Sequence, residues 1–68
     1  MIETLTLNET AAYLRRHGMS IANTVLADGL EQGKYSFGLC VVSSRGSRSF
    51  QIFRTLLDQW IAERTVGA

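Results

Sequence analysis

Residues 37–53 read FGLCVVSSRGSRSFQIF and contain two short apolar segments on either side of a polar stretch. Both segments are rich in aromatic and β-branched residues, which favour β-strands, and the Ser and Gly residues between them favour a turn. We therefore predict a β-hairpin whose six-residue connection, SSRGSR, is longer than a tight two-residue turn. The connection carries Arg45 and Arg48 and no acidic residue, so the hairpin would project a basic tip.

A capping box marks the start of a first helix before the hairpin. The Thr6 hydroxyl can accept a hydrogen bond from the backbone N–H of Glu9, and the Glu9 carboxylate can accept one from the backbone N–H of Thr6. Apolar residues then recur at helical spacing and form one stripe: Leu7, Ala11 and Leu14. We predict a helix over residues 7–17 that ends at Gly18, because glycine readily adopts the left-handed conformation that stops a helix.

A second helix is predicted over residues 21–32, with Ser20 as its N-cap and Gly33 as its end. Its apolar positions form two adjacent rows: Ala22, Leu26 and Leu30 in one, and Ile21 and Val25 in the other. Only residues 18–20 would separate the two helices, and a turn this short with a glycine in it is typical of a helix-turn-helix.

Alternation predicts which side chains of the hairpin face the core. In the first strand one side carries Tyr35, Phe37, Leu39 and Val41, and we expect this side to face inward. In the return strand, residues 49–53, the alternating apolar positions are Phe50 and Ile52. A third helix follows, which either begins after Thr55 as its cap or already includes Arg54, and its apolar face is formed by Leu56, Leu57, Trp60 and Ile61.

These elements predict a single α+β domain over residues 1–68: a small winged helix-turn-helix in the order α-α-β-β-α, with a two-stranded antiparallel hairpin. Residues 65–68 are expected to fray. The aromatic residues expected to meet under the hairpin are Tyr35, Phe37, Phe50, Phe53 and Trp60. A chain of this length buries only about 60% of its unfolded surface, so a second copy or a nucleic-acid partner would add stability.

Charge is distributed unevenly along the chain. The net charge is only +1, but residues 33–57 hold four basic residues and no acidic one, whereas residues 1–32 are acidic overall. A basic hairpin is the pattern of a surface that meets nucleic acid, although a solvated hairpin with solubilising arginines would have the same composition. Cys40 is the only cysteine, which excludes an internal disulfide and predicts a buried, inert thiol. The first residues lack a signal-peptide pattern and no stretch is long enough to span a membrane, so we expect a cytoplasmic protein.

The chain lacks the residue sets of the common enzyme classes. His17 is the only histidine, and the pattern places it at a helix end, where a cation interacts favourably with the helix dipole. The acidic residues are scattered rather than clustered, and no glycine-rich phosphate loop or nucleophile motif occurs. We therefore expect a protein that is not an enzyme and that holds neither a metal nor a cofactor.

Helix two would provide the major-groove contacts of a helix-turn-helix, because such proteins read base edges from the N-terminal residues of their second helix. The outward positions there are Ser20, Asn23, Thr24 and Ala27, followed by Asp28. Asn can pair with adenine through two hydrogen bonds, and small methyl groups can contact a thymine methyl. The alternative for these residues is a helix cap at Ser20 and ordinary solvated helix surface beyond it.

The hairpin would provide minor-groove or phosphate contacts. Arg45 and Arg48 flank Gly46, and arginine suits a narrow minor groove or a phosphate. Hydroxyl groups beside them that could donate to phosphates belong to Ser43, Ser44 and Ser47, and cations that could hold flanking phosphates are Arg15, Arg16 and Lys34. So few phosphate contacts give modest, salt-sensitive affinity, which favours cooperative binding of several copies.

The chain resembles the excisionase-like, MerR-type winged-helix proteins of phages and integrative elements. Those domains open with a phrase such as T-x-x-E-x-A-x-Y-L, which stands here at residues 6–14, and close with a pattern such as R-x-x-I-x-x-x-x-L-x-x-W-I, which is similar to residues 48–61. The middle segment, residues 29–38, is similar to small phage-associated proteins of Gram-positive bacteria. The resemblance covers nearly the whole chain. The second helix of these relatives is rich in arginine, whereas residues 20–28 here carry no cation.

The resemblance implies a DNA-binding protein that acts through its second helix and its wing. Some members bend double-stranded DNA beside an integrase during excision, and others regulate transcription. We therefore expect a recombination directionality factor or a small regulator of a mobile element, with DNA and an integrase as partners. The alternative is a protein-interaction module, such as a phage adaptor or an inhibitor of a host protein, which uses the same fold without binding DNA.

Overall fold

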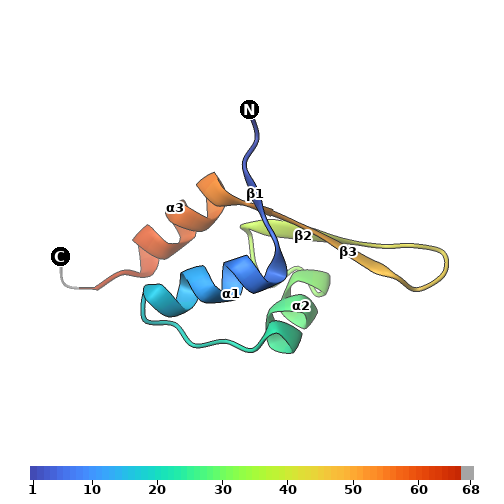
Figure 1. Cartoon of the computed structure of the whole chain (residues 1–68), viewed down its shortest axis with the longest axis horizontal. Coiled ribbons are helices and arrows are strands. Elements are labelled where there is room, and N and C mark those ends of the chain that lie inside the picture. The colour runs from blue at the N-terminus through green and yellow to red at the C-terminus, as the bar shows by residue number, and fades with distance from the viewer. Residues whose placement is uncertain (67–68) are drawn as a thin grey trace.

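The computed structural model describes residues 1–66 and has an α+β architecture of three helices and a three-stranded antiparallel sheet (Figure 1). Along the chain the elements are β1 (Thr4–Leu5), α1 (Leu7–Arg16), α2 (Asn23–Glu31), β2 (Gly38–Val42), β3 (Arg48–Phe53) and α3 (Arg54–Arg64). The molecule measures 45 × 28 × 18 Å, and Figure 1 shows why it is elongated: the β2–β3 hairpin extends beyond the helices.

Helix α1 begins and ends as its local sequence predicts. The Glu9 N–H donates to the Thr6 hydroxyl oxygen at 3.1 Å, and the Thr6 N–H donates to the Glu9 carboxylate at 2.9 Å, so the capping box is confirmed. At the other end His17 is the cap residue and Gly18 has a φ of 92°, which a residue with a side chain rarely adopts. The apolar stripe of α1 faces the core through the buried Ala11 and Leu14.

Helix α2 begins later than predicted, and Ser20 is not its N-cap. The helix starts at Asn23, with Ala22 as a cap residue that makes no side-chain hydrogen bond. Met19 and Ile21 pack against the core, and this packing accompanies a non-helical connection up to Ala22. The connection between the helices therefore spans residues 17–22 rather than residues 18–20.

The predicted hairpin is present, but its first strand faces the other way. Strand β2 begins at Gly38, where the expected alternation breaks because residues 36–37 form a turn. Gly38 pairs with the buried Ile52, so the even-numbered residues of β2 face the core. Leu39 and Val41 lie on the outer face, with 42% and 57% of their surface exposed, and the prediction that they face inward is wrong.

A third strand completes the sheet. Strand β1 pairs with β3 on the side opposite β2, with Leu5 opposite Ile52 and Thr4 opposite Phe53, which gives the strand order β1-β3-β2. The backbone N–H of Arg54 donates to the carbonyl oxygen of Glu3 at 3.1 Å and extends this pairing. A two-residue strand has no sequence period, and the two-stranded sheet predicted from the hairpin is thus incomplete.

The core lies between the inner face of the sheet and the three helices. Its buried members are Ala11, Leu14, Leu26, Leu30, Phe37, Ile52 and Leu57. The Phe37 ring stacks on Tyr35 at 5.1 Å between ring centroids and meets the edge of Trp60 at 5.2 Å, which confirms that these three aromatics meet. Phe50 also packs against this core, whereas Phe53 lies outside the cluster.

The start of α3 and the exposure of two apolar helix residues differ from the predictions. Helix α3 starts at Arg54, without a side-chain cap, so Thr55 is not a cap. Leu56 and Val25 were expected on apolar faces but are 42% and 55% exposed. Residues 65–66 follow α3 without regular structure, and the rest of the segment expected to fray, residues 67–68, lies outside the described residues.

We expect the substitution Gly38→Ala to lower the free energy of unfolding by about 1–3 kcal/mol, because it overpacks the hairpin. A methyl group at this position would lie 2.7 Å from the carbonyl oxygen of Gln51 and 3.0 Å from the Ile52 side chain. The first contact is to backbone, so the strands would have to move apart. Urea unfolding followed by circular dichroism measures the change, and Ser49→Ala on the exposed face of β3 is the control. A loss below about 0.5 kcal/mol would contradict the prediction.

Candidate nucleic-acid interface

The loop at the tip of the hairpin, residues 43–47, is held by its own hydrogen bonds. The Ser43 N–H donates to the carbonyl oxygen of Ser47 at 2.8 Å, and the Ser43 hydroxyl accepts from the N–H groups of Ser47 at 3.1 Å and Arg45 at 3.3 Å. Gly46 has a φ of 84° at the bend. The tip therefore has a defined shape, in which Ser43 organises the turn while Ser44 and Arg45 are exposed.

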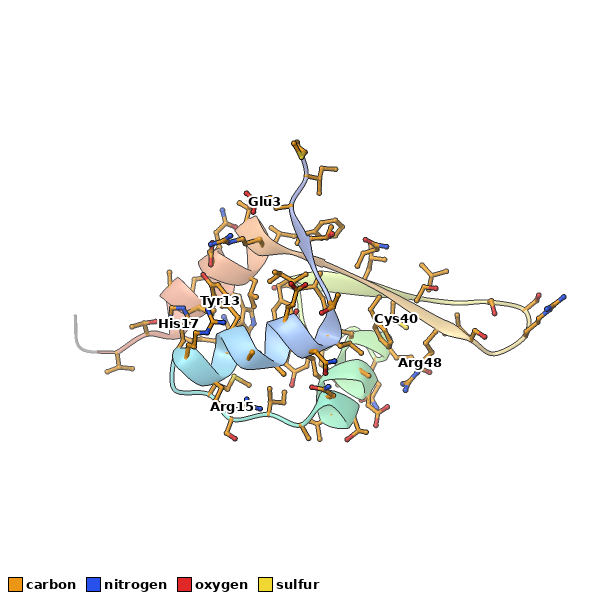
Figure 2. All side chains as sticks on the ribbon, viewed as in Figure 1. Glu3, Tyr13, Arg15, His17, Cys40 and Arg48 are labelled. Carbon is orange, nitrogen blue, oxygen red and sulfur yellow. The ribbon has the colours of Figure 1, made fainter. Side chains whose placement is uncertain are left out.

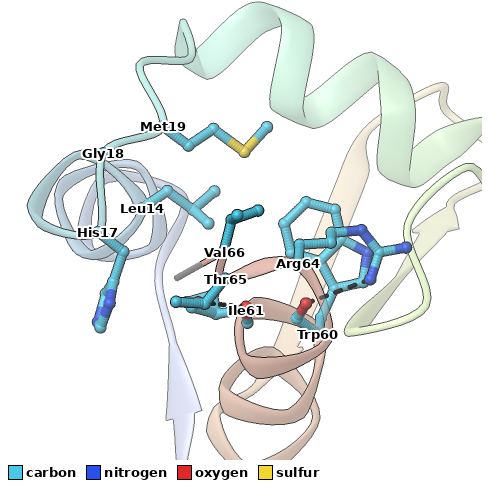
Figure 3. Close-up of a pocket in the computed structure, with 9 residues that line it drawn as sticks. All are labelled: Leu14, His17, Gly18, Met19, Trp60, Ile61, Arg64, Thr65 and Val66. Carbon is cyan, nitrogen blue, oxygen red and sulfur yellow. Dashed lines mark hydrogen bonds between the residues drawn. The ribbon is translucent and has the colours of Figure 1, made fainter. Parts of the chain in front are cut away.

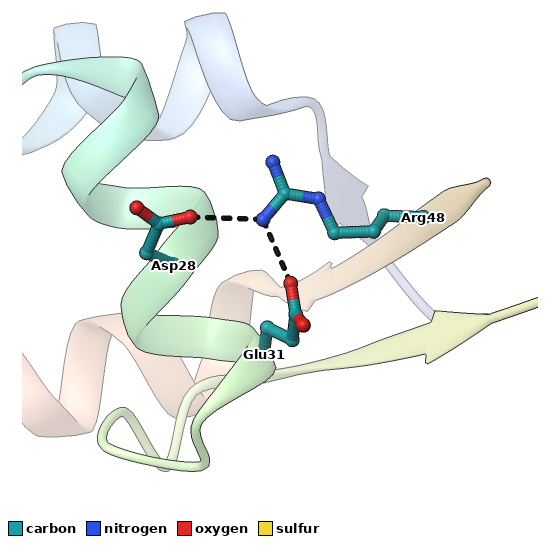
Figure 4. A network of polar contacts seen from close by, with 3 residues as sticks. All are labelled: Asp28, Glu31 and Arg48. Carbon is teal, nitrogen blue, oxygen red and sulfur yellow. Dashed lines mark hydrogen bonds and ion pairs between the residues drawn. The ribbon is translucent and has the colours of Figure 1, made fainter. Parts of the chain in front are cut away.

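Arg48, at the start of β3, forms ion pairs with two acidic residues of α2. Its guanidinium donates to the carboxylates of Asp28 at 2.9 Å and Glu31 at 2.8 Å, as Figure 4 shows. These hydrogen bonds, first to Asp28 and then to Glu31, raise the pKa of the Arg48 guanidinium above its ordinary value. The Arg48 side chain connects β3 to α2 instead of extending outward from the hairpin tip.

The position of Arg48 in the strand explains this contact. Arg48 has the same parity along β3 as Phe50 and Ile52, which face inward, so it lies on the side of the hairpin that faces α2. Asp28 and Glu31 are three residues apart and therefore share one face of α2. Residue parity and helical spacing are visible in the sequence, but the ion pairs also depend on how β3 lies against α2, which only the structure shows.

Of the four residues predicted to enter the major groove, only Asn23 and Thr24 are both exposed and part of α2. Asn23 and Thr24 occupy the exposed first turn of α2, as predicted, and the Asn23 side-chain amide donates to the side chain of Asn8 on α1. Ala27 is only 4% exposed, so the prediction that it faces outward is wrong. Ser20 is exposed, but it lies in the connection before the helix.

Ion pairing separates the cations of the chain into two sets. Within residues 1–66, four exposed cations form no ion pair: Arg15, Arg16, Lys34 and Arg45. The cations that do pair with acids are Arg48, Arg54 and Arg64. The four unpaired cations were all predicted as DNA contacts, and Figure 2 shows one of them, Arg15, beside the connection that leads to α2.

The acidic residues are, by contrast, all engaged. Ion pairs occupy the carboxylates of Glu3, Asp28, Glu31, Asp58 and Glu63, and Glu9 forms the capping box. Asp58 also accepts a hydrogen bond from the Tyr13 hydroxyl, and this bond raises the pKa of Tyr13 above its ordinary value. The cations without an acidic partner among the described residues are therefore Arg15, Arg16, Lys34 and Arg45, whereas Asp28 and Glu31 share one cation and leave a negative charge on α2.

A shallow groove of about 360 Å³ lies between the end of α1 and helix α3 (Figure 3). Its lining is mixed, with the apolar Leu14, Met19 and Ile61 beside the polar side chains of His17, Arg64 and Thr65. Arg64 lies over the Trp60 ring, 4.1 Å from its centroid, and donates to the Trp60 carbonyl oxygen at 3.2 Å. Across residues 1–66, no group of three or more His, Cys, Asp or Glu side chains is placed to hold a metal ion.

Comparisons with known proteins found no match: no family model, no curated protein and no solved structure resembles this chain closely enough to be identified. The likeness to excisionase-like proteins thus stays a prediction from the sequence.

None of the helices within residues 1–66 combines the length and the apolar character needed to cross a membrane. The Cys40 thiol, expected to be buried, is free and partly exposed.

Proposed function

We propose that this protein binds double-stranded DNA as a small winged helix-turn-helix domain, and that it acts as an excisionase-like directionality factor or as a regulator of a mobile element. The order of two helices, a hairpin and a third helix supports this proposal, as does the contact of α2 with β2 beneath the hairpin. The observation that carries it is the set of exposed, unpaired cations: Arg15, Arg16, Lys34 and Arg45.

In this proposal the hairpin tip and the start of α2 contact the duplex from two sides. Arg45 enters the minor groove or binds a phosphate, and Gly46 beside it lets the backbone approach closely. Asn23 and Thr24 lie at the N-terminal turn of α2, from which a helix-turn-helix reads base edges. Arg48 positions the hairpin against α2 and does not itself contact DNA.

The small number of free cations sets the expected strength of binding. Four phosphate contacts give a salt dependence with a slope of about −4 in a plot of log affinity against log salt concentration. A single domain would bind weakly at physiological salt, and functional occupancy would require several copies on one site or a recombinase bound beside them. This requirement fits a factor that assembles with an integrase.

We expect Arg45→Ala to weaken binding to duplexes of any sequence about three- to tenfold at low salt and to reduce the salt slope by about 0.9, because one phosphate contact is lost. Fluorescence anisotropy with a labelled random duplex measures both quantities. Arg64→Ala is the matched control, since it removes the same charge from a residue of α3 that is paired with Glu63. Equal affinities for wild type and Arg45→Ala would show that the hairpin tip does not touch DNA.

A second function is favoured by one observation, the two carboxylates that surround Arg48. Asp28 and Glu31 leave a net negative charge on the exposed side of α2, where phosphates would have to approach. A module that binds another protein through this face and the hairpin would meet no such repulsion. Absence of any anisotropy change at low salt and high protein concentration, together with a defined complex with another protein, would favour this function over DNA binding.

A further inference from the structure

Strand β2 forms an open edge of the sheet. The strand order β1-β3-β2 places β3 in the centre and leaves one side of β2 without a neighbouring strand. The backbone groups of β2 alternate between β3 and this open side. At one end of the hairpin ladder the Phe53 N–H donates to the carbonyl oxygen of Phe37, and at the other end the Ser43 N–H donates to the carbonyl oxygen of Ser47. On the β2 side of the hairpin, the odd-numbered residues are therefore the ones that form hydrogen bonds across the ladder.

It follows that the even-numbered residues of β2 direct their backbone groups to the open side. These residues are Gly38, Cys40 and Val42. Among residues 1–66, their N–H and C=O groups make no hydrogen bond to another loop, helix or side chain. The edge thus presents three donors and three acceptors in the spacing that an added strand would satisfy.

The sequence of β2 does nothing to block such an addition. The strand reads GLCVV and contains no charge and no proline, which are the residues that normally protect an edge. The first residues of β3 also lack a neighbouring strand on the side away from β2. They include the charged Arg48 and the polar Ser49, so this edge, unlike that of β2, carries a charge. Strand β1, at the other edge, spans only two residues. Of the sheet edges within residues 1–66, the β2 edge is therefore the one open to pairing.

We propose that the β2 edge pairs with β2 of a second copy of this chain, in an antiparallel arrangement related by a twofold axis. With the axis at Cys40, each Gly38 faces Val42 of the other copy, so all the open backbone groups find partners. Each Leu39 then faces the other copy's Val41 on the outer face, where both are now exposed. An uncharged strand meets no repulsion from its own copy, whereas a charged one would.

The area available argues that this dimer is weak. The exposed apolar side chains are Leu39, Val41 and Val42, with 42%, 57% and 50% of their surfaces accessible. A five-residue strand pair of this kind buries less than the roughly 1,200 Å² of a stable interface. We expect dimers to form at protein concentrations of about 0.1–1 mM, and the proposal holds whether or not the protein binds DNA.

The test uses the full chain with two variants that leave the β2–β3 ladder intact. Val42→Pro removes an N–H that points to the open side, and proline is tolerated at such an edge position. Val41→Lys places a cation on the outer face of each strand. Sedimentation equilibrium should show a dimer for the wild type, at least tenfold weaker association for both variants, and unchanged association for Gln59→Lys on the exposed side of α3.

Nuclear magnetic resonance identifies the edge that is used. We expect the amide signals of Gly38, Cys40 and Val42 to shift with protein concentration more than those of Leu39 and Val41, because the latter amides already bond to β3. A wild-type protein that stays monomeric with concentration-independent signals up to about 1 mM would overturn the proposal. Shifts confined to the groove beside Trp60, or a Val42→Pro variant that dimerises like the wild type, would also overturn it.

Discussion

Phe37→Ala is expected to remove a large part of the stability of the protein at room temperature. The Phe37 side chain is fully buried, and its ring contacts both Tyr35 and Trp60. Removing a buried phenylalanine ring costs about 3–5 kcal/mol, because apolar burial is lost and a cavity remains. A domain of 68 residues has a total stability of roughly 3–10 kcal/mol, so this one substitution removes a large part of it.

Circular dichroism and urea unfolding measure this effect, and two further variants calibrate it. Phe37→Leu keeps most of the buried volume and should cost less than Phe37→Ala. Leu56→Ala is the surface control, since Leu56 is 42% exposed and its loss should change stability by less than about 1 kcal/mol. If Phe37→Ala behaves like Leu56→Ala, then the aromatic cluster does not hold the hairpin to the helices.

The parts of the fold that follow from local chemistry could be predicted from the sequence. The capping box at Thr6 and the glycine at the end of α1 fix that helix through hydrogen bonds between near neighbours. The hairpin follows from two apolar segments around a polar turn, and its register is set by the loop 43–47. In each case the interaction that decides the structure is contained within a few residues.

The parts that depend on tertiary packing could not be predicted in this way. The connection before α2 stays non-helical up to Ala22 while Met19 and Ile21 pack against the core, although the local sequence favours an earlier helix start. The alternation of β2 changes at Gly38, because a turn precedes it and redirects Phe37 into the core. Period-two patterns predict which residues share a face, but they do not reveal where the strand begins.

The candidate site also has parts that follow from the local sequence and parts that depend on tertiary packing. The exposed cations follow from their positions at the end of α1 and in loops, and four of the five that were predicted to contact DNA have no acidic partner in residues 1–66. Arg48 is the fifth, and its pairing depends on how β3 lies against α2. Ala27 was assigned to the outer face, but tertiary packing turns the face of Leu26, Ala27 and Leu30 to the core and leaves Val25 exposed.

The Arg48 ion pairs lead to the second large effect: Asp28→Asn combined with Glu31→Gln is expected to strengthen DNA binding about tenfold at low salt. The two amides keep the shape of the side chains but remove two negative charges from the exposed side of α2. The guanidinium of Arg48 would then be free to contribute one more phosphate contact, which should steepen the salt slope by about 0.9. A tenfold change corresponds to about 1.4 kcal/mol, within the range of one charge-assisted hydrogen bond.

A matched double variant separates this local effect from a change in net charge. Glu3→Gln with Glu63→Gln also removes two acids, but these pair with Arg54 and Arg64, away from the hairpin tip. We expect this control to strengthen binding less than threefold in the same anisotropy titration with a random duplex. Equal gains in both double variants would mean that net charge alone governs affinity, and no gain in either would mean that α2 does not face the DNA. In the second case the carboxylates around Arg48 would be better explained as part of a surface that binds another protein.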